Sequence, residues 1–328
     1  GHAVVADGAG DEHGVSGLPV LRGGTLVGIL TSRDMRFCRD YSQRVSAVMT
    51  PDPVVERGEP MLDTAQQKFD RHKIEKLPVV DDAGRLTGLI TVKDMEKHRQ
   101  FPLAATDRAG RLLVGAAVGT NEPLGRVELL AQEKVDFIVI DSAHGDSAPV
   151  HRAIRQIKDR FDLPVVGGNV ATADGTRRLL DTGCDLVKVG VGPGSICTTR
   201  IVAGIGVPQF TAVADCAAVA AEAGVPVIAD GGIRFSGDIT KAIAAGAHTV
   251  MLGNLFAGLR EAPGREVIFE GRIFKTYRGM GSIGAIKAGS GDRYRIAEGE
   301  DAVPEGVEGR VPYRGELKPY LHQLVTGL

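Results

Sequence analysis

Residues 136–170 read DFIVIDSAHGDSAPVHRAIRQIKDRFDLPVVGGNV and contain one complete strand–helix–strand unit. The apolar run 136–141 ends in aspartate, residues 146–160 have the spacing of an amphipathic helix, and residues 164–170 form a second apolar run. Two continuous apolar strands joined by a helix are typical of a parallel sheet. This unit therefore predicts an α/β fold.

The same alternation continues on both sides of this unit, from residue 111 onward, and predicts a parallel sheet covered on both faces. Most runs end in Gly, Asp or Asn, and in a (β/α)₈ barrel that edge is the active-site face. We favour this barrel over a doubly wound open sheet, because glycines at 231–232 and Gly-Asn at 253–254 suit the phosphate site of such barrels. Six βα units are visible where a barrel needs eight, so either two units precede residue 1 or the sheet is open and incomplete. The apolar runs are 112–118, 136–141, 164–170, 186–191, 225–230 and 248–253, and further amphipathic segments are 172–183 and 210–223.

The composition is that of an ordinary globular protein and gives no sign of a nucleic-acid-binding or membrane protein. Of 328 residues, 43% are hydrophobic and 24% charged, and the net charge is −2, which gives no basic excess for nucleic acid or a lipid surface. No apolar run has the ~18 residues of a membrane span, and no secretory signal is visible. The four cysteines lack CxxC spacing, so we expect neither a zinc site nor a disulfide framework, and we expect a cytoplasmic location.

An internal repeat precedes the barrel units. Residues 15–35 (VSGLPVLRGGTLVGILTSRDM) and 74–95 (IEKLPVVDDAGRLTGLITVKDM) each predict a hairpin followed by a helix start, and residues 61–73 have helical spacing. The repeat resembles a tandem pair of CBS modules, which implies a purine nucleotide, ATP or GTP, in the cleft between them. By that resemblance Thr31, Asp34, Thr91 and Asp94 would face the nucleotide, although each Thr/Asp pair also suits a helix N-cap. The first module lacks its leading helix, because residues 1–14 have no apolar stripe.

The segment 190–200, GVGPGSICTTR, is the densest candidate for chemistry. Its glycines predict a tight loop with accessible backbone, although a lone G-x-G pattern also occurs in plain turns. Cys197 in such a loop, on the open face of a barrel, is placed to act as a reactive thiolate, with Thr199 and Arg200 close by. Cys184 and Cys216 are expected to be inert packing residues, and Cys38 lies outside the barrel.

Three further glycine segments are candidates for holding a nucleotide: 229–236 (ADGGIRFS), 251–254 (MLGN) and 277–282 (YRGMGS). Asp230 ends a strand and suits a ribose diol, and the glycines at 231, 232 and 253 let backbone amides approach a phosphate. We expect 277–282 to be a backbone-rich loop at the edge of a purine. Turn geometry alone also accounts for Gly231.

Residues 283–313 lack clear periodicity, and a stretch this long is usually a functional lid or disordered. It contains Arg293, Tyr294 and the pair Glu305 and Glu308.

The segment 141–145 (DSAHG) begins with Asp141, which ends a strand and is suited to bind a second nucleotide. His144 in that segment is either a base or a loop histidine that hydrogen-bonds locally.

Together the GPGSICTTR, ADGGI, YRGMGS and DRY segments, in this order and with the CBS pair, resemble the inosine-5′-monophosphate (IMP) dehydrogenase family of bacterial type, from residue 15 to about 326. The resemblance implies an NAD-dependent oxidoreductase that converts IMP to XMP, the committed step of guanine nucleotide synthesis, on a (β/α)₈ barrel that assembles as a homotetramer. It places a regulatory CBS pair at 1–98 and the barrel at 99–328, with a mobile flap at about 283–313.

The resemblance also assigns roles. Cys197 would attack purine C2 and form a covalent thioimidate, and Arg293 would activate water with help from Tyr294 and Thr199. An arginine base is chemically unusual, since its ordinary pKa is above 12, and it requires a site that disfavours the cation. NAD⁺ would contact Asp141, Ser142, Ala143, Gly190, Val191 and Gly192, and K⁺ would be held by the carbonyls of Gly192, Gly194 and Cys197. IMP would be held by Ser195, Asp230, Gly231, Gly232, Gly253, Asn254, Tyr277, Arg278, Gly279, Met280, Gly281 and Glu305.

The chain departs from the family pattern in ways that leave two alternatives open. The first two barrel strands, the leading helix of the first CBS module and the C-terminal tail are expected to lie outside it, and Asn254 stands where serine is commoner. One alternative is a GMP reductase-like enzyme, whose flap lacks the Arg-Tyr pair and which usually lacks the CBS insertion. The other is a catalytically inactive, nucleotide-sensing fragment.

Overall fold

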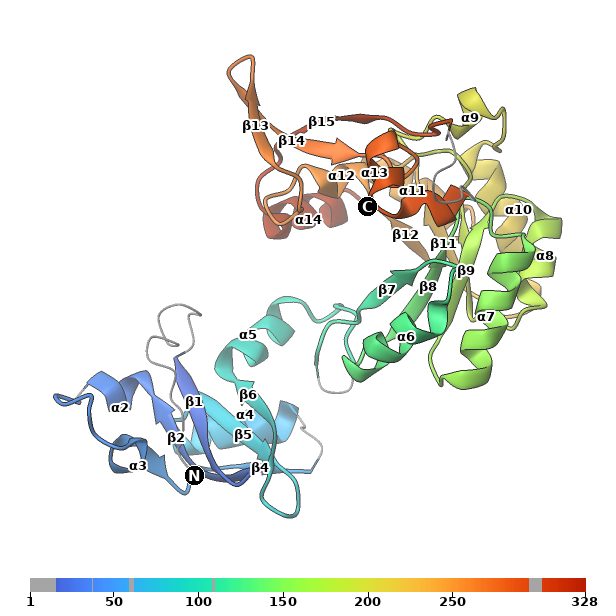
Figure 1. Ribbon diagram of the computed structural model, residues 1–328. Helices are drawn as coiled ribbons and strands as arrows, with labels where there is room; N and C mark the ends of the chain where they lie inside the picture. Colours follow the sequence, from blue (N-terminus) through green and yellow to red (C-terminus); the bar gives the residue numbers. More distant parts are fainter. Residues whose placement is uncertain (1–15, 37, 59–61, 108–109, 295–302) are drawn as a thin grey trace. The chain divides into compact units, whose positions relative to one another are not determined.

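A computed structural model describes residues 16–36, 38–58, 62–107, 110–294 and 303–328. The chain divides into two compact units, residues 1–113 and 114–328, and each is described by itself (Figure 1). This division falls after residue 113, whereas we expected a boundary after residue 98. Between these two positions the chain bonds to itself, because Leu113 donates to the Ala105 carbonyl at 3.0 Å. The residues 1–14 that were expected to lack a helix lie outside the described part.

The N-terminal unit consists of two related halves, as the repeat predicts. Each half contains a three-stranded sheet, one in the order β1-β2-β3 and the other β4-β5-β6. The hairpins β1–β2 and β5–β6 share a register irregularity at the same aligned position, between Val20 and Leu21 and between Val79 and Val80. The elements are β1 (Gly17–Arg22), β2 (Thr25–Thr31), α2 (Ser32–Arg36), α3 (Val45–Val48), β3 (Thr50–Pro51), β4 (Glu56–Arg57), α4 (Leu62–His72), β5 (Lys76–Val80), β6 (Leu86–Thr91) and α5 (Val92–Gln100).

The Thr/Asp pairs of the repeat act as helix caps. Asp94 accepts hydrogen bonds from the backbone and hydroxyl of Thr91, at 2.8 and 2.7 Å, and Thr91 accepts one from the backbone of Asp94, which is a capping box. Asp34 accepts the same two bonds from Thr31, both at 2.7 Å. The capping interpretation is therefore confirmed, and it leaves the nucleotide-binding interpretation untested.

The second unit is built on a six-stranded parallel sheet that contains all six predicted strands. Its order, β7-β8-β9-β10-β11-β12, follows the chain without reversal. A doubly wound sheet reverses its strand order at a switch point, so this order is that of a barrel. Within the described residues β7 and β12 do not pair, and the sheet is an open part-barrel. The strands are β7 (Gly115–Val118), β8 (Phe137–Asp141), β9 (Val165–Val170), β10 (Leu186–Val189), β11 (Val227–Asp230) and β12 (Thr249–Met251).

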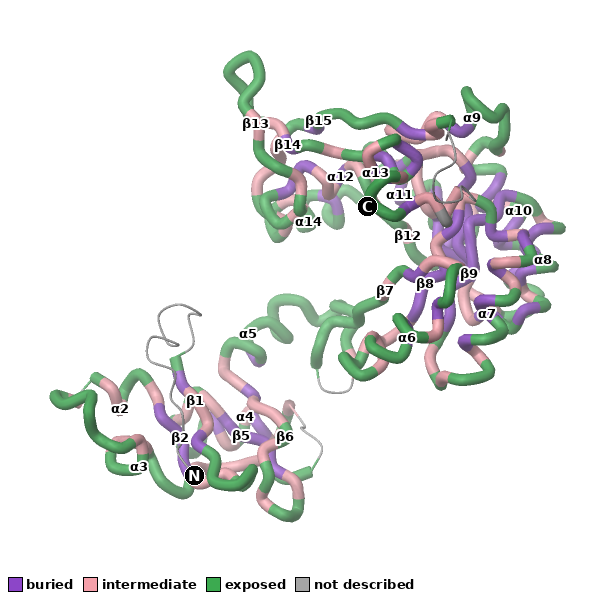
Figure 2. Tube along the Cα trace, in the orientation of Figure 1, coloured by how far each residue is buried: buried purple, intermediate pink, exposed green. Residues whose placement is uncertain are grey.

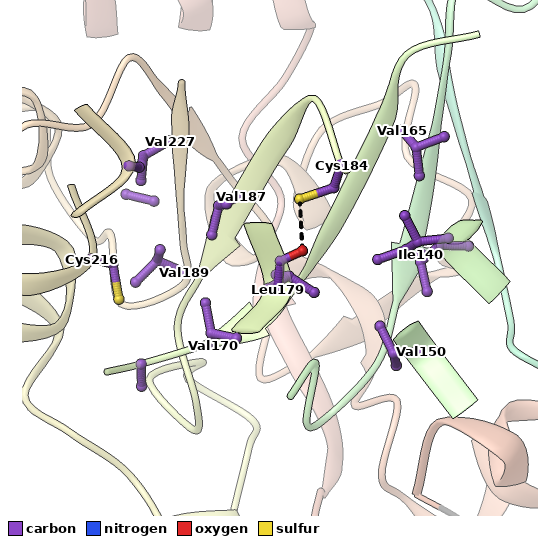
Figure 3. Close-up of a cluster of buried hydrophobic side chains, with 14 of the residues drawn as sticks. Ile140, Val150, Val165, Val170, Leu179, Cys184, Val187, Val189, Cys216 and Val227 are labelled. Carbon is purple, nitrogen blue, oxygen red and sulfur yellow. Dashed lines mark hydrogen bonds between the residues drawn. The ribbon is translucent and has the colours of Figure 1, made fainter. Parts of the chain in front are cut away.

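The helices that the structure describes pack against one face of this sheet and not both, which corrects the expectation of a sheet covered on two sides (Figure 2). The main core joins strand residues such as Ile140 and Val187 to helix residues such as Val150 and Leu179 (Figure 3). The opposite face carries a separate cluster, centred on Val139, Val166 and Ile228, to which no described helix residue contributes. The strands read as continuous apolar runs because this inner face is also apolar until the strand ends. The helices are α6 (Pro123–Gln132), α7 (Ala148–Arg160), α8 (Ala173–Leu180), α9 (Thr199–Val202), α10 (Gln209–Glu222), α11 (Ser236–Ala244) and α12 (Asn254–Ala257).

The remainder of the unit is more ordered than the sequence predicted. The expectation that 283–313 lacks structure is wrong for two stretches, because this range includes two short helices and a strand. That strand, β15, pairs antiparallel with β14 in a three-stranded sheet of order β13-β14-β15, and β14 includes Tyr277 and Arg278, which were expected in a loop. Elements of five residues are too short to show periodicity. The elements of this part of the unit are β13 (Glu266–Phe269), β14 (Arg272–Arg278), α13 (Ile283–Lys287), the 3₁₀ helix η1 (Ser290–Tyr294), β15 (Glu308–Pro312) and α14 (Leu317–Thr326).

One buried lysine ties this sheet to the segment after α12. Lys275 of β14 is 2% exposed, and its ammonium donates hydrogen bonds to the carbonyls of Leu259 (2.8 Å), Arg260 (3.1 Å) and Ala262.

Across the described parts of both units, no helix combines the length and apolar character needed to cross a membrane.

Candidate active site

Charged side chains occupy the inner face at the carboxyl ends of three strands. Because side chains alternate along a strand, Asp141, Lys188 and Asp230 point away from the helix-facing positions next to them. The side chain of Lys188 has no exposed surface, and its Nζ lies 2.9 Å from Asp141 Oδ1 and 2.6 Å from Asp230 Oδ2. Asn169, also buried, donates from Nδ2 to Asp230 Oδ2 at 2.8 Å and to the Gly190 carbonyl at 2.7 Å.

Sequence reasoning missed both Lys188 and Asn169. The signal for Lys188 was available, because a lysine within the apolar run 186–191 must be paired if that run is buried. Asn169 gave only a weak signal, as one more polar residue at a strand end.

Arg293 reaches this group from η1. Its guanidinium forms an ion pair with Asp141 Oδ2, and its carbonyl accepts a hydrogen bond from the backbone of Ala143 at 3.3 Å. Burial alone would lower the pKa of Arg293, but Asp141, Tyr294 and Asp230 outweigh it, and the net pKa is raised. Burial alone would likewise raise the pKa of Asp141, but Lys188 and Arg293 hold it below its usual value.

This pairing is the reverse of what an arginine base requires. A base must lose its proton, and the carboxylate beside Arg293 stabilises the protonated cation. Activation of water by Arg293 therefore requires the guanidinium to leave Asp141. The adjacent phenol of Tyr294 also holds its proton firmly, because burial raises its pKa, as do Cys197 and Glu305, against the opposing effect of Arg293.

Cys197 stands at the start of a hydrogen-bond chain. Its half-buried thiol donates to Thr199 Oγ1 at 3.3 Å, and the Thr199 hydroxyl donates to Glu305 Oε2 at 2.6 Å. A carboxylate at the end of such a chain can accept a proton that the thiol releases. It can likewise accept one from a molecule that takes the place of the thiol beside the Thr199 hydroxyl. Cys184 and Cys216 are buried, as predicted, and burial raises the pKa of Cys184 to about 11.

Backbone pairing brings three distant segments together around this chain. Thr198 donates to the Glu305 carbonyl (2.9 Å) and Glu305 to the Gly281 carbonyl (3.0 Å). Val307 donates to the Ile196 carbonyl at 3.0 Å. The end of the expected flap thus lies between the cysteine loop and the 277–282 segment.

The glycine loop itself is braced from outside. Arg200 donates from Nε to the Val191 carbonyl at 3.1 Å and from Nη2 to the Val207 carbonyl at 2.6 Å. The guanidinium expected near the thiol therefore bonds to backbone. Gly190 has φ +146°, and a Cβ there would lie 2.0 Å from the Asp230 carbonyl oxygen, so this position requires glycine.

Two of the predicted phosphate-binding segments each lie against another predicted segment: 229–236 against the cysteine loop, and 251–254 against Tyr277. Gly231 has φ +94°, and a Cβ on it would lie 2.7 Å from Pro193, which places the 229–236 loop against the cysteine loop. A Cβ on Gly253 would lie 2.9 Å from the hydroxyl of Tyr277. Burial and the neighbouring Asp230 raise the pKa of Tyr277.

One cavity of about 1530 Å³ collects several of the predicted residues. Its walls do not include Cys197 or Ser195, which lie in the adjoining loop. His144 is exposed, and its backbone exchanges hydrogen bonds with the Ser142 hydroxyl at 3.2 and 3.3 Å, which favours the local role considered for it. The predicted residues on the cavity wall are Asp141, Gly253, Tyr277, Arg278, Met280 and Arg293.

The fold and site define a part-barrel α/β protein with a cysteine loop at the carboxyl edge of its strands. Residues 61–328 match the model of the IMP dehydrogenase / GMP reductase domain, and residues 11–39 match that of the CBS domain. The chain belongs to the IMP dehydrogenase / GMP reductase family, as the sequence motifs predicted.

Relatives agree with this assignment. The chain is 54% identical over 321 residues to inosine-5′-monophosphate dehydrogenase of Halalkalibacterium halodurans, and 54% identical over 324 residues to that of Aquifex aeolicus. Each alignment covers 97% of this chain and 66% of the relative, so the chain spans just under two thirds of their length. A cysteine-to-alanine variant of GMP reductase from Trypanosoma brucei, solved with guanosine 5′-monophosphate, superposes with a TM-score of 0.83 at 41% identity, over 96% of this chain and 66% of that one.

Proposed function

We propose that this chain carries the catalytic machinery of an IMP dehydrogenase, which oxidises IMP to XMP with NAD⁺ and water. The observation that carries the proposal is the chain from Cys197 through Thr199 to Glu305, beside the site where Arg293 pairs with Asp141. The relatives named as inosine-5′-monophosphate dehydrogenase support it.

The steps use these groups in order. The Cys197 sulfur adds to C2 of the purine, and its proton passes through Thr199 to Glu305. Bound NAD⁺ would accept the C2 hydrogen as hydride, and a thioimidate would then join C2 to the Cys197 sulfur. Water then attacks C2, the C–S bond breaks, and XMP and the thiol are released. Arg293 takes the water proton once its guanidinium is free of Asp141, with Tyr294 and Thr199 assisting.

The binding residues are proposed from the same geometry. Asp230 would accept the ribose hydroxyls of IMP. The phosphate would lie among Ser195, Gly232, Gly253, Asn254 and Tyr277, and the purine along 278–281 beside Glu305. Asp141 and the loops 142–143 and 190–192 would contact the cofactor. Asp230 and Asp141 share Lys188, so the two nucleotide sites are adjacent.

A monovalent cation is proposed at the carbonyls of Gly192, Gly194 and Cys197. Neutral backbone oxygens are suitable ligands for a hard cation. The Gly194 carbonyl accepts the backbone N–H of Cys197 at 3.1 Å and keeps a second lone pair. A Cβ at Gly192 would lie 2.7 Å from the Arg200 side chain, so only glycine lets the loop lie this close to the arginine that bonds to it. K⁺ bound here would order the loop that carries the thiol.

Regulation and assembly are proposals of the same kind. We propose that the repeat binds a purine nucleotide, ATP or GTP, and that the protein acts as a homotetramer in the cytoplasm. The two CBS-like halves support the first. The four free thiols suit a reducing compartment.

GMP reductase remains the competing function, because a GMP reductase superposes on this chain. The repeat no longer separates the two activities. The T. brucei protein matches 96% of this chain, which includes most of the repeat. Arg293 and Tyr294 remain the discriminating residues.

The test is intact-protein mass spectrometry after incubation with IMP and NAD⁺ and an acid quench. Wild type is expected to gain one XMP-sized adduct, Cys197→Ala none, and Cys38→Ala, whose thiol lies in the other unit, the same adduct as wild type. NADH absorbance follows turnover in parallel. Oxidation of NADPH on addition of GMP, with no adduct from IMP, would favour the reductase, and no reaction in either arm would favour the inactive fragment.

A further inference from the structure

Lys188 lies behind two carboxylates that reach the solvent side of the site. Its side chain is fully buried, whereas those of Asp141 and Asp230 keep 26% and 20% of their surface exposed. The lysine comes from β10, and its partners come from β8 and β11, on either side in the sheet. An ammonium in this position touches no ligand directly, but it holds both carboxylates that are proposed to do so.

Lys188, Asp141 and Asp230 together carry one net negative charge, which a second cation can neutralise. Two carboxylates and one ammonium sum to −1, and Arg293 on the far oxygen of Asp141 brings the sum to zero. Tyr277 of β14 faces Asp230 as a neutral phenol, and Asn169 of β9 donates to the Asp230 oxygen that Lys188 also contacts. Lys188 is therefore the fixed cation, and Arg293, carried by η1 in the expected flap, is the exchangeable one.

We propose that Lys188 is a positioning residue for the reaction proposed above: its buried charge orients Asp230 for the substrate ribose and Asp141 for Arg293, and so couples the two sites. This inference rests on the proposed function. Without the ammonium, two carboxylates would share one pocket with a single cation, and Asp230 would lose the partner that sets its direction. Asp141 would also lose one of the two cations that hold its pKa low, so it would retain its proton to a higher pH than in wild type.

The test compares Lys188→Met, which keeps length and removes charge, with Lys188→Arg, which keeps the charge. The double variant Lys188→Met/Asp141→Asn restores the net charge to −1. Lys241→Met, at an exposed position on α11, is the matched control. The first readout is IMP affinity by calorimetry without cofactor, between pH 6 and pH 8.5.

We expect Lys188→Met to weaken IMP binding by about 10-fold or more at high pH, the loss expected when charge-assisted hydrogen bonds around a binding carboxylate are broken. The loss should shrink as the pH falls, because protonation of an acid replaces the missing cation. Lys188→Arg and the double variant should recover most of the affinity, and Lys241→Met should match wild type. A purely structural role would give a loss that is independent of pH and is not recovered in the double variant.

The second readout needs no ligand. The urea midpoint of Lys188→Met should fall as the pH rises, because an acid with a raised folded-state pKa stabilises the fold only while protonated. Unchanged IMP affinity and an unchanged pH profile in Lys188→Met would overturn the positioning role alone. Failure of wild type to bind IMP would overturn the proposed function and the substrate role of Lys188 with it.

Discussion

Replacing Lys275 by methionine would remove the ammonium that holds the segment after α12, while keeping an unbranched side chain of similar length. Three carbonyls, of Leu259, Arg260 and Ala262, would lose their donor at a position that is 2% exposed. Hydrogen bonds to a charged donor contribute about 1.5–3 kcal/mol each, so the three together set an upper bound of roughly 4–9 kcal/mol. Methionine is not subject to the desolvation cost of the ammonium, which is several kcal/mol, so the expected net loss of unfolding free energy is about 2–4 kcal/mol.

The assay is urea denaturation followed by tyrosine fluorescence. The chain has no tryptophan, and four of its five tyrosines lie in the unit that contains Lys275, so this signal reports mainly on that unit. Lys241→Met is the control, because Lys241 is 71% exposed and pairs with Asp238 only at 3.5 Å, so a change below about 0.5 kcal/mol is expected. A Lys275→Met variant as stable as this control would refute the reasoning.

Three further results are expected. At pH 8, iodoacetamide should label Cys197 and leave Cys184 unmodified in the folded protein, because Cys184 is buried and its pKa is about 11; peptide mapping that finds equal labelling would contradict the site. Gly190→Ala should abolish IMP binding in calorimetry, because its Cβ would lie 2.0 Å from the Asp230 carbonyl oxygen; retained affinity would show that this loop adapts. Asp141→Asn should reduce stability at neutral pH, and the difference should shrink progressively as the pH falls below about 4, because wild type loses the benefit of its lowered Asp141 pKa as that carboxyl protonates; a pH-independent difference in urea midpoint would argue against the ion pairs.

The barrel part of the fold was predictable because its signals are local. Each strand of the parallel sheet is a short apolar run, and the helices between them have clear amphipathic spacing, as in 146–160. The ends of these runs also located Asp141 and Asp230 at one edge of the sheet. The sheet β13-β14-β15 was missed, because its strands are short and partly exposed and their pairing joins residues far apart in sequence.

The site was predictable as residues but not as contacts. The motif around Cys197 identified the nucleophile, whereas its link through Thr199 to Glu305 depends on the folded chain. The ion pair of Arg293 with Asp141 was also not foreseen, and it opposes the role expected for that arginine. Which carboxylate compensates a given cation is decided by three-dimensional packing.

The hydrogen bond between Thr199 and Glu305 joins residues 106 positions apart in the chain. Contacts of such long sequence separation are slow to form, because the loop between them must close first. During synthesis from the N-terminus, Cys197 leaves the ribosome well before Glu305 does. The nascent thiol is therefore without its proton acceptor until the segment that carries Glu305 has been made and has docked against the cysteine loop.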